Sequence, residues 1–211
     1  MFVKSIMIPK YKCITVQEHE DLGSVLSKME EHEIDAVPVL ADDLYTGIVT
    51  RDEVYRRYFV SDQKKDKFLE EMMAVDVLVN QDKYLQGYEL FESTLLELKH
   101  FPLMAVVDDS KRFLGAVTRS DVLEQFESAF GVHKKGVRIA FTSVETEGRI
   151  ARLSEIAHQF HEHIISLVTF DETDKLVRRI VMKIEDNENI NKFLAKLEQS
   201  GFRVLDIKRD M

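Results

Sequence analysis

The sequence predicts a mixed α/β (α+β) protein, built from a unit used twice and followed by a smaller unit of different order. The first observation is a repeat: the segment 47–53 reads G-I-V-T-R-D-E, and the segment 115–121 reads G-A-V-T-R-S-D. Glycine, threonine and arginine recur at one offset of 68 residues (47 to 115, 50 to 118 and 51 to 119). A repeat at a fixed offset indicates one supersecondary unit used twice, so the two copies are expected to pack together with pseudo-twofold symmetry. The second observation is that, after residue 136, the order of predicted strands and helices differs from the order in the repeat.

The first copy is predicted to span residues 1–60. Apolar residues at helical spacing predict helices, and short apolar runs predict strands. The expected elements are a helix over 21–32, strands over 34–40 and 45–49, and a helix over 52–58. The segment 61–67, S-D-Q-K-K-D-K, contains no apolar residue and is expected to be a linker.

The second copy is predicted to span residues 68–130 and to follow the same plan. Its expected elements are a strand over 75–79, a helix over 84–100, strands over 103–107 and 113–117, and a helix over 121–130. Residues 131–136, G-V-H-K-K-G, are expected to form a second linker.

The third unit is predicted to span residues 136–211. Its expected elements are strands over 137–144, 164–170, 176–184 and 202–207, with helices over 149–162 and 190–199. The resulting order, β-α-β-β-α-β, is that of the ferredoxin-like fold.

Composition excludes several functional classes. The net charge of −9 argues against a nucleic-acid partner, because such proteins carry a basic face. No apolar stretch approaches the roughly 20 residues that a membrane helix needs, so no membrane partner is expected. The single cysteine, Cys13, cannot form an internal disulfide, which favours a cytoplasmic protein. No catalytic constellation or complete set of metal ligands is evident, so the protein is expected not to be an enzyme and to hold no resident cofactor.

The repeated motif is suited to binding a sugar. A carboxylate in the first turn of a helix, such as Asp121, can accept two hydrogen bonds from a ribose diol and remains ionised beside the positive end of the helix dipole. The hydroxyl of Thr118 lies one turn earlier and can bond a sugar or phosphate oxygen. Helix capping by the same residue pattern is the alternative explanation.

Residues 1 to about 130 resemble a tandem pair of CBS domains, a Bateman module, a family that senses adenosyl compounds. The family motif is an apolar strand running into G-h-h-[T/S]-x-x-D, where h is apolar, and 115–121 matches it in full. The first copy departs from the motif, because Glu53 stands at the position that matches Asp121.

Residues 136–211 resemble an ACT domain, a module often associated with amino acids. The resemblance places a ligand at the first strand-to-helix turn, with Glu145, Glu147, Gly148 and Arg149 as the candidate residues. The order CBS, CBS, ACT is similar to that of proteins named for acetoin utilization.

In CBS pairs the nucleotide sites are usually built crosswise from the two copies. The resemblance therefore implies one site formed by Lys12, Ile14, Ile34, Asp35, Ala36, Thr118, Arg119 and Asp121. It implies a second site formed by Thr50, Glu53, Val77, Phe101 and Leu103.

Together these observations predict a non-catalytic regulatory protein. The expected ligands are an adenine nucleotide (AMP, ADP, ATP or a related adenosyl compound) in the CBS pair and an amino acid or small metabolite in the ACT domain. A homodimer that acts on a further, unidentified protein is expected. Two alternatives stay open: an enzyme of acetoin metabolism with an unrecognised active site, and an assembly scaffold that binds no ligand.

Overall fold

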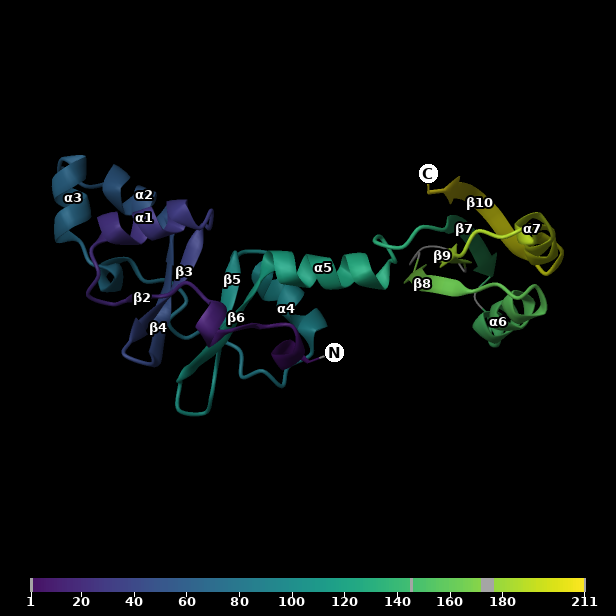
Figure 1. Ribbon diagram of the computed structural model, residues 1–211, viewed down its shortest axis with the longest axis horizontal. Coiled ribbons are helices and arrows are strands. Elements are labelled where there is room, and N and C mark those ends of the chain that lie inside the picture. Colours follow the sequence, from purple (N-terminus) through teal and green to yellow (C-terminus); the bar gives the residue numbers. More distant parts are fainter. Residues whose placement is uncertain (1, 145, 172–176, 211) are drawn as a thin grey trace. The chain divides into compact units, whose positions relative to one another are not determined.

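The chain divides into two compact units, Met1–Leu123 and Glu124–Met211, in a computed structural model (Figure 1). The structure describes residues 2–144, 146–171 and 177–210. No helix within these ranges is long and apolar enough to cross a membrane.

The first unit contains two three-stranded sheets, one for each copy of the repeat. The first sheet has the order β2-β3-β4 and the second β1-β6-β5. The strands are β1 (Ile8–Pro9), β2 (Val16–Gln17), β3 (Ala36–Ala41), β4 (Leu44–Thr50), β5 (Leu103–Val107) and β6 (Phe113–Thr118). The α-helices are α1 (Leu22–Glu31), α2 (Arg51–Phe59), α3 (Lys65–Glu71), α4 (Phe91–Leu98) and α5 (Arg119–Ala129), the last crossing the boundary between the units. Short 3-10 turns occupy Val3–Ser5, Lys10–Lys12 and Ala74–Val77.

The two copies exchange segments. The strand β1, near the start of the first copy, pairs with β6 of the second copy, with Ile8 opposite Ala116. The segment near the start of the second copy does the same to the first copy, because Val79 and Ile48 exchange two backbone hydrogen bonds of 2.8 and 2.9 Å. Each sheet is therefore completed by the segment that leads into the other copy.

The two hairpin turns show the predicted pseudo-twofold symmetry. The N–H of Tyr45 donates to the carbonyl of Lys111, and the N–H of Phe113 donates to the carbonyl of Asp43, both at 2.9 Å. The repeat offset of 68 relates Tyr45 to Phe113 and Asp43 to Lys111, so the two bonds are equivalent. The interpretation of the sequence repeat as two packed copies is confirmed.

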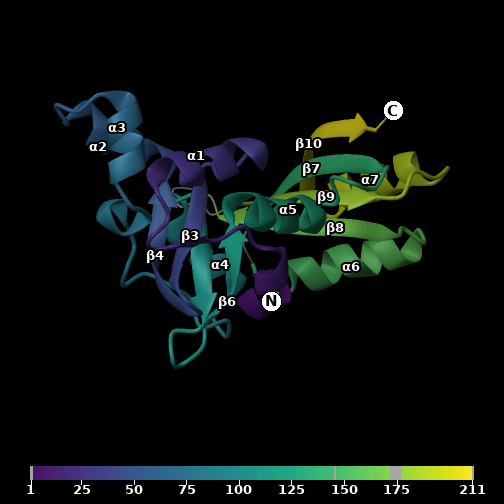
Figure 2. The ribbon, with the colours of Figure 1, turned by 60° about the vertical axis from the view of Figure 1, so that its left-hand side comes forward.

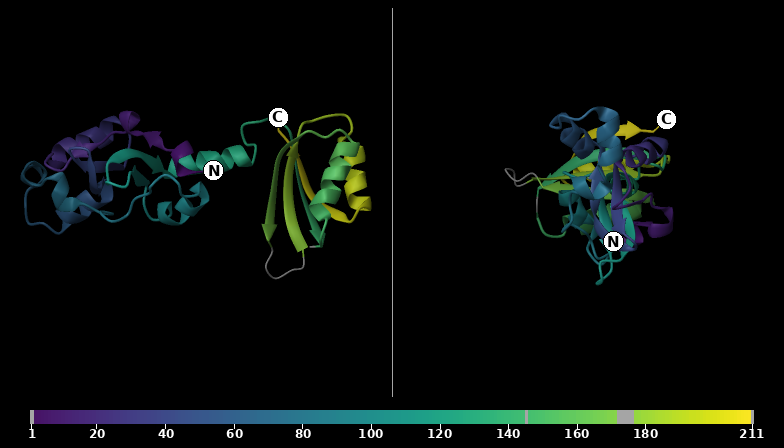
Figure 3. Two further views of the ribbon diagram at one scale, coloured as in Figure 1. Left: turned by 90° about the horizontal axis from the view of Figure 1, so that it is seen from below. Right: turned by 90° about the vertical axis from the view of Figure 1, so that its left-hand side faces the viewer.

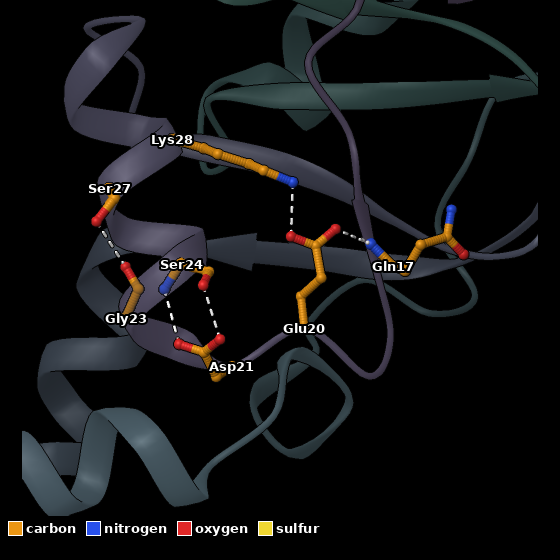
Figure 4. Close-up of polar contacts among 7 residues, drawn as sticks. All are labelled: Gln17, Glu20, Asp21, Gly23, Ser24, Ser27 and Lys28. Carbon is orange, nitrogen blue, oxygen red and sulfur yellow. Dashed lines mark hydrogen bonds and ion pairs between the residues drawn. The ribbon is translucent and has the colours of Figure 1, made fainter.

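Helix α1 begins at a side-chain cap (Figure 4). The carboxylate of Asp21 accepts the N–H of Ser24 at 2.8 Å and its hydroxyl at 2.7 Å, which satisfies a free donor of the first turn. In the loop just before it, Glu20 accepts the N–H of Gln17 at 2.8 Å and pairs with Lys28 at 2.6 Å. These bonds fix the helix while its apolar side packs into the core.

The predicted linker at 61–67 is wrong in its second half. Helix α3 begins at Lys65 and packs against α1. Phe68, which lies just beyond the charged run, is 2% exposed, and Leu69 packs against the same core. Because burial of these two side chains stabilises α3, the charged residues just before them form the first turn of the helix.

The predicted strand at 75–79 is wrong except at Val79, which pairs with Ile48, and the first half of the predicted helix at 84–100 is also wrong. Residues Ala74–Val77 form a 3-10 turn, and within 84–100 the α-helix is α4, Phe91–Leu98. Leu85 instead lies beside β5, where its N–H donates to Ala105 and its carbonyl accepts the N–H of Val107, both at 2.8 Å.

The second unit has the predicted β-α-β-β-α-β order. Its elements are β7 (Val137–Val144), α6 (Arg149–Gln159), β8 (Ile164–Asp171), β9 (Val177–Ile184), α7 (Ile190–Gln199) and β10 (Phe202–Arg209). The strands form an antiparallel sheet of order β10-β7-β9-β8, which can be followed in Figure 2. Both helices cover one face of this sheet (Figure 3), and the core between the two layers contains Phe141, Leu153, Met182 and Phe193.

Substituting Gly115 tests the exchange of segments. A Cβ at Gly115 would lie 2.2 Å from the carbonyl oxygen of Ile8, so Gly115→Ala must push β1 away from β6. We expect a loss of about 1–3 kcal/mol in the free energy of unfolding of the first unit, measured by urea denaturation. Gly23→Ala is the control, because its Cβ would meet a side-chain oxygen of Asp21 at 3.1 Å and no backbone atom closer than 3.8 Å, and it should cost less stability than Gly115→Ala. Equal stability of Gly115→Ala and the unchanged protein would contradict the strand pairing.

Candidate functional site

A cavity of about 520 Å³ lies in the first unit, beside the start of α2. Both copies of the repeat contribute to its wall. The first copy contributes Asp35 and residues 50–53, 55 and 56. The second copy contributes the loop 100–102 that precedes β5, and Val79 comes from the exchanged segment. The volume is in the range typical of small-molecule sites.

The cavity gathers part of the second predicted site. Thr50, Glu53 and Phe101 all line it. Val77 is fully buried in the core of the first copy, and Val79, two residues later, lines the cavity in its place. Leu103 is 6% exposed and packs in the core between the two copies.

Besides Val79, sequence reasoning missed six residues of the wall: Tyr55, Arg56, Arg51, Asp52, His100 and Pro102. Helical spacing was an available signal for the first two, because residues three and four positions after Asp52 share its side of a helix. His100 belongs to the second copy, and local sequence does not show that it lies beside residues of the first copy.

Glu53 is held by two arginines on its own helix. Its Oε1 accepts from Nε of Arg57 at 2.9 Å, and its Oε2 lies 3.7 Å from Arg56. The Glu53 side chain is 14% exposed, so these ion pairs neutralise a largely buried carboxylate. Thr50 caps the helix, since its hydroxyl oxygen accepts the N–H of Glu53 at 3.1 Å.

Arg51 fixes the start of β3 rather than reaching freely into the cavity. Its N–H donates to the carbonyl of Asp35 at 2.9 Å, its Nε to the Asp35 carboxylate at 3.2 Å and its Nη2 to the carbonyl of Ile34 at 3.0 Å. A hydrogen bond with the Tyr55 side chain, ahead of the charge of Asp35, raises the pKa of Arg51. Asp35 was predicted for the site of Asp121, and the structure places it in this cavity instead.

The second copy of the motif forms a capping box. Oδ2 of Asp121 accepts the N–H of Thr118 at 2.7 Å and its hydroxyl at 2.6 Å, and the N–H of Asp121 donates to the Thr118 hydroxyl oxygen at 3.1 Å. The reciprocal bonds match the capping alternative considered from the sequence. Both bonds that the Asp121 carboxylate accepts from Thr118 end on Oδ2. Among the described contacts, Oδ1 accepts no hydrogen bond and is available to a ligand.

The leading segment of the chain lies close to this motif. The turn Lys10–Lys12 packs against β6, and the charge of Asp121 adds to the larger effect of burial in raising the pKa of Cys13. Lys12 is exposed, with its Nζ 5.9 Å from the ring centre of Tyr11. The predicted proximity of this segment to Thr118 and Asp121 is therefore present.

Other residues of the first predicted site lie in the framework. Arg119 is the counterpart of Arg51: its Nε donates to the carbonyl of Leu98 at 2.9 Å and its Nη2 to that of Phe101 at 3.4 Å. The apolar members pack into the cores of the copies, and these are Ile14, Ile34 and Ala36.

The turn between β7 and α6 borders a second cavity, of about 340 Å³. Of the four candidate residues there, Gly148 and Arg149 line it, Glu147 is exposed and Glu145 lies outside the described residues. Gly148 has a φ of +79° at the N-cap of α6, and a Cβ there would meet no atom within 4 Å.

Arg149 joins three elements of the second unit. Its Nε donates to the Ser143 hydroxyl at 2.6 Å, and Nη1 and Nη2 donate to the carbonyls of Ser200 and Gly201 at 3.2 and 2.9 Å. The guanidinium also lies 4.2 Å from the ring centre of Phe202. These contacts tie the start of α6 to β7 and to the turn before β10, so Arg149 has a clear structural role.

Comparison with known proteins supports the CBS resemblance. Residues 3–59 match the family described as CBS domain. A CBS domain-containing protein of unknown function from Bacillus anthracis is 25% identical with a TM-score of 0.54, over 60% of this chain and 93% of that one. A hypothetical conserved protein from Geobacillus kaustophilus is 24% identical with a TM-score of 0.54, over 60% and 96% of the two chains. The CbpB protein of Listeria monocytogenes, solved in complex with c-di-AMP, is 23% identical with a TM-score of 0.52, over 59% and 94%.

The structural role of Arg149 can be tested by conservative substitution. Lysine keeps the charge but cannot reproduce the forked hydrogen bonds and the stacking, so Arg149→Lys should lower the stability of the second unit by about 1–3 kcal/mol. Arg152→Lys is the control, because Arg152 pairs with the exposed carboxylate of Glu155 and should change stability by less than about 0.5 kcal/mol. Chemical denaturation measures both. Similar stability of the two variants would mean that the Arg149 contacts contribute little.

Proposed function

We propose that the first unit is a regulatory module that binds an adenine nucleotide: AMP, ADP, ATP or a related adenosyl compound. The cavity of about 520 Å³ at the Thr50 motif carries this proposal, because both copies of the repeat contribute to it. Similar folds have been solved with such ligands: CbpB with c-di-AMP, the protein CBSX2 with AMP, and the CBS domain of a bacterial CNNM/CorC family Mg²⁺ transporter with ATP. In this proposal the chain acts by binding and not by catalysis.

The chemistry of the cavity suits a nucleotide. Phe101 and Tyr55 provide aromatic surface for a base, and Val79 adds an apolar contact. The Thr50 hydroxyl oxygen accepts the N–H of Glu53, and the hydroxyl can still donate its hydrogen to a sugar or phosphate oxygen.

The motif of the second copy provides a second place for a sugar. Capping occupies Oδ2 of Asp121, and Oδ1 can accept a ribose hydroxyl without loss of the cap. The two roles of this carboxylate, capping and ligand binding, are therefore compatible.

For the second unit we propose an ACT-like role, binding an amino acid or small metabolite at the turn of Gly148. The supporting observations are the β-α-β-β-α-β order and the cavity of about 340 Å³ at this turn. A thermal-shift panel of amino acids should identify a ligand that raises the melting temperature. Gly148→Asn, which tolerates the left-handed backbone and adds a side chain beside the cavity, should reduce that shift; an unchanged shift would place the ligand elsewhere.

We propose a homodimer that acts on a separate regulated protein. The end of α2 exposes large apolar side chains, Phe59 at 89% and Val60 at 76%, and such exposure favours an interface. Light scattering should give a mass near twice the 24.5 kDa of the chain at micromolar concentration. A mass equal to that of one chain would refute the proposal.

The nucleotide proposal predicts the effect of Asp121→Ala. Removal of a charged acceptor for ribose costs about 1.5–3 kcal/mol, so affinity at this site should drop roughly ten- to a hundredfold in calorimetry with AMP and ATP. The substitution also removes a helix cap. Asp21→Ala is therefore the control, since Asp21 also caps a helix, α1, but is not part of either copy of the repeated motif. Loss of affinity in both variants would indicate damage to the fold, and full affinity in Asp121→Ala would exclude this carboxylate from the site.

A further inference from the structure

We infer that a nucleotide in the cavity beside Thr50 is held mainly through its phosphate and that Arg56 recognises this phosphate. This inference rests on the proposed function, because it assumes that a nucleotide binds in the first unit. It assigns different tasks to the two copies of the motif.

The two copies differ in charge along the helix that follows the motif. In the first copy, Arg56 and Arg57 follow Glu53 by three and four residues. The repeat offset of 68 places Glu124 and Gln125 at the equivalent positions of the second copy. Over the matched segments, 51–57 carries three basic and two acidic residues, a net charge of +1, and 119–125 carries one basic and two acidic residues, a net charge of −1, so the first motif is the more favourable one for a phosphate.

Arg56 can exchange its partner for a phosphate at little cost. Its Nη2 lies 2.8 Å from Oδ2 of Asp52, and both side chains are largely exposed, at 68% and 80%. An exposed ion pair of this kind contributes little to stability, and Asp52 stays hydrated when it is released. A phosphate offers the guanidinium two parallel charge-assisted hydrogen bonds in return.

The other charges of the wall stay balanced during this exchange. Glu53 keeps its contact with Arg57 at 2.9 Å, and Asp52, the carboxylate that Arg56 releases, is 80% exposed, so water screens its charge from the phosphate. Arg51 remains bound to Asp35 and to the carbonyl of Ile34. His100 lines the same cavity and adds a second group that can contact a phosphate oxygen.

Glu53 is correspondingly a poor partner for a ribose diol. Both of its carboxylate oxygens lie against arginines, Oε1 at 2.9 Å from Arg57 and Oε2 at 3.7 Å from Arg56. A sugar would have to compete with those cations. Affinity in this cavity therefore depends on the phosphate, whereas the Asp121 motif is suited to the sugar.

Calorimetry on the full chain with ATP, AMP and adenosine tests the inference. The unchanged protein should bind ATP at least about tenfold more tightly than adenosine, because one charge-assisted pair with Arg56 is worth about that factor. Arg56→Gln should remove about tenfold of the ATP affinity and leave adenosine affinity within about twofold. Glu124→Gln, the matched change in the second copy, should leave both affinities in place. Added salt should weaken ATP binding more in the unchanged protein than in Arg56→Gln.

The outcomes separate this inference from the proposed function. Binding of adenosine as tightly as ATP, or an equal loss of both ligands in Arg56→Gln, overturns the inference alone. Undiminished ATP affinity in Arg56→Gln does the same. Failure of the unchanged protein to bind any of the three probes overturns the proposed function, and the inference with it. Circular dichroism of Arg56→Gln checks that the substitution, at a side chain that is 68% exposed, leaves the fold in place.

Discussion

The exchange of leading segments between the two copies is the constraint on which the first unit depends. Each copy of the repeat has a glycine where the other copy's segment crosses its strand. A Cβ at Gly115 would lie 2.2 Å from the carbonyl oxygen of Ile8, and one at Gly47 would lie 3.1 Å from that of Val79. The glycine of the sequence motif is therefore explained by close backbone approach. Since neither sheet is complete without the other copy's segment, the two copies fold as one body.

The spacing of apolar residues predicted helices and strands reliably where tertiary contacts do not override the local preference. The strand 137–144 and the helix 190–199 were predicted with the bounds that the structure has, and both carry a clear apolar face. The segment 84–90 was predicted as helix because its apolar residues have helical spacing, yet Leu85 bonds to β5. That bond is set by the packing of the second copy, about twenty residues away in sequence (85 to 105 and 107), and no local pattern encodes it.

The sequence predicted the motif residues of the candidate site but not the residues that surround them in the cavity wall. The repeat identified Thr50 and Glu53, and the family resemblance added Phe101; these three residues line one cavity. The positions of Val79 and His100 follow from the crossing of the two copies and could not be derived from spacing. Charge alone also misleads about arginines, because Arg119 and Arg149 donate to backbone carbonyls and hold loops in place. Every residue has a backbone carbonyl, so a sequence does not show which carbonyl an arginine bonds. These structural roles become evident only in the folded structure.

The shape of the cavity connects binding to the packing of the copies. The start of α2 in the first copy and the loop 100–102 of the second copy both line the cavity. A ligand that contacts both binds the packed arrangement more tightly than any arrangement in which the copies move apart, so its binding free energy adds to the stability of that packing. The Arg56–Asp52 ion pair on α2 is exposed and weak, while Arg51 and Arg119 anchor the loops through backbone carbonyls. The rearrangement caused by a ligand is therefore expected in the side chains of α2 and in the packing of the two copies, with each sheet retained.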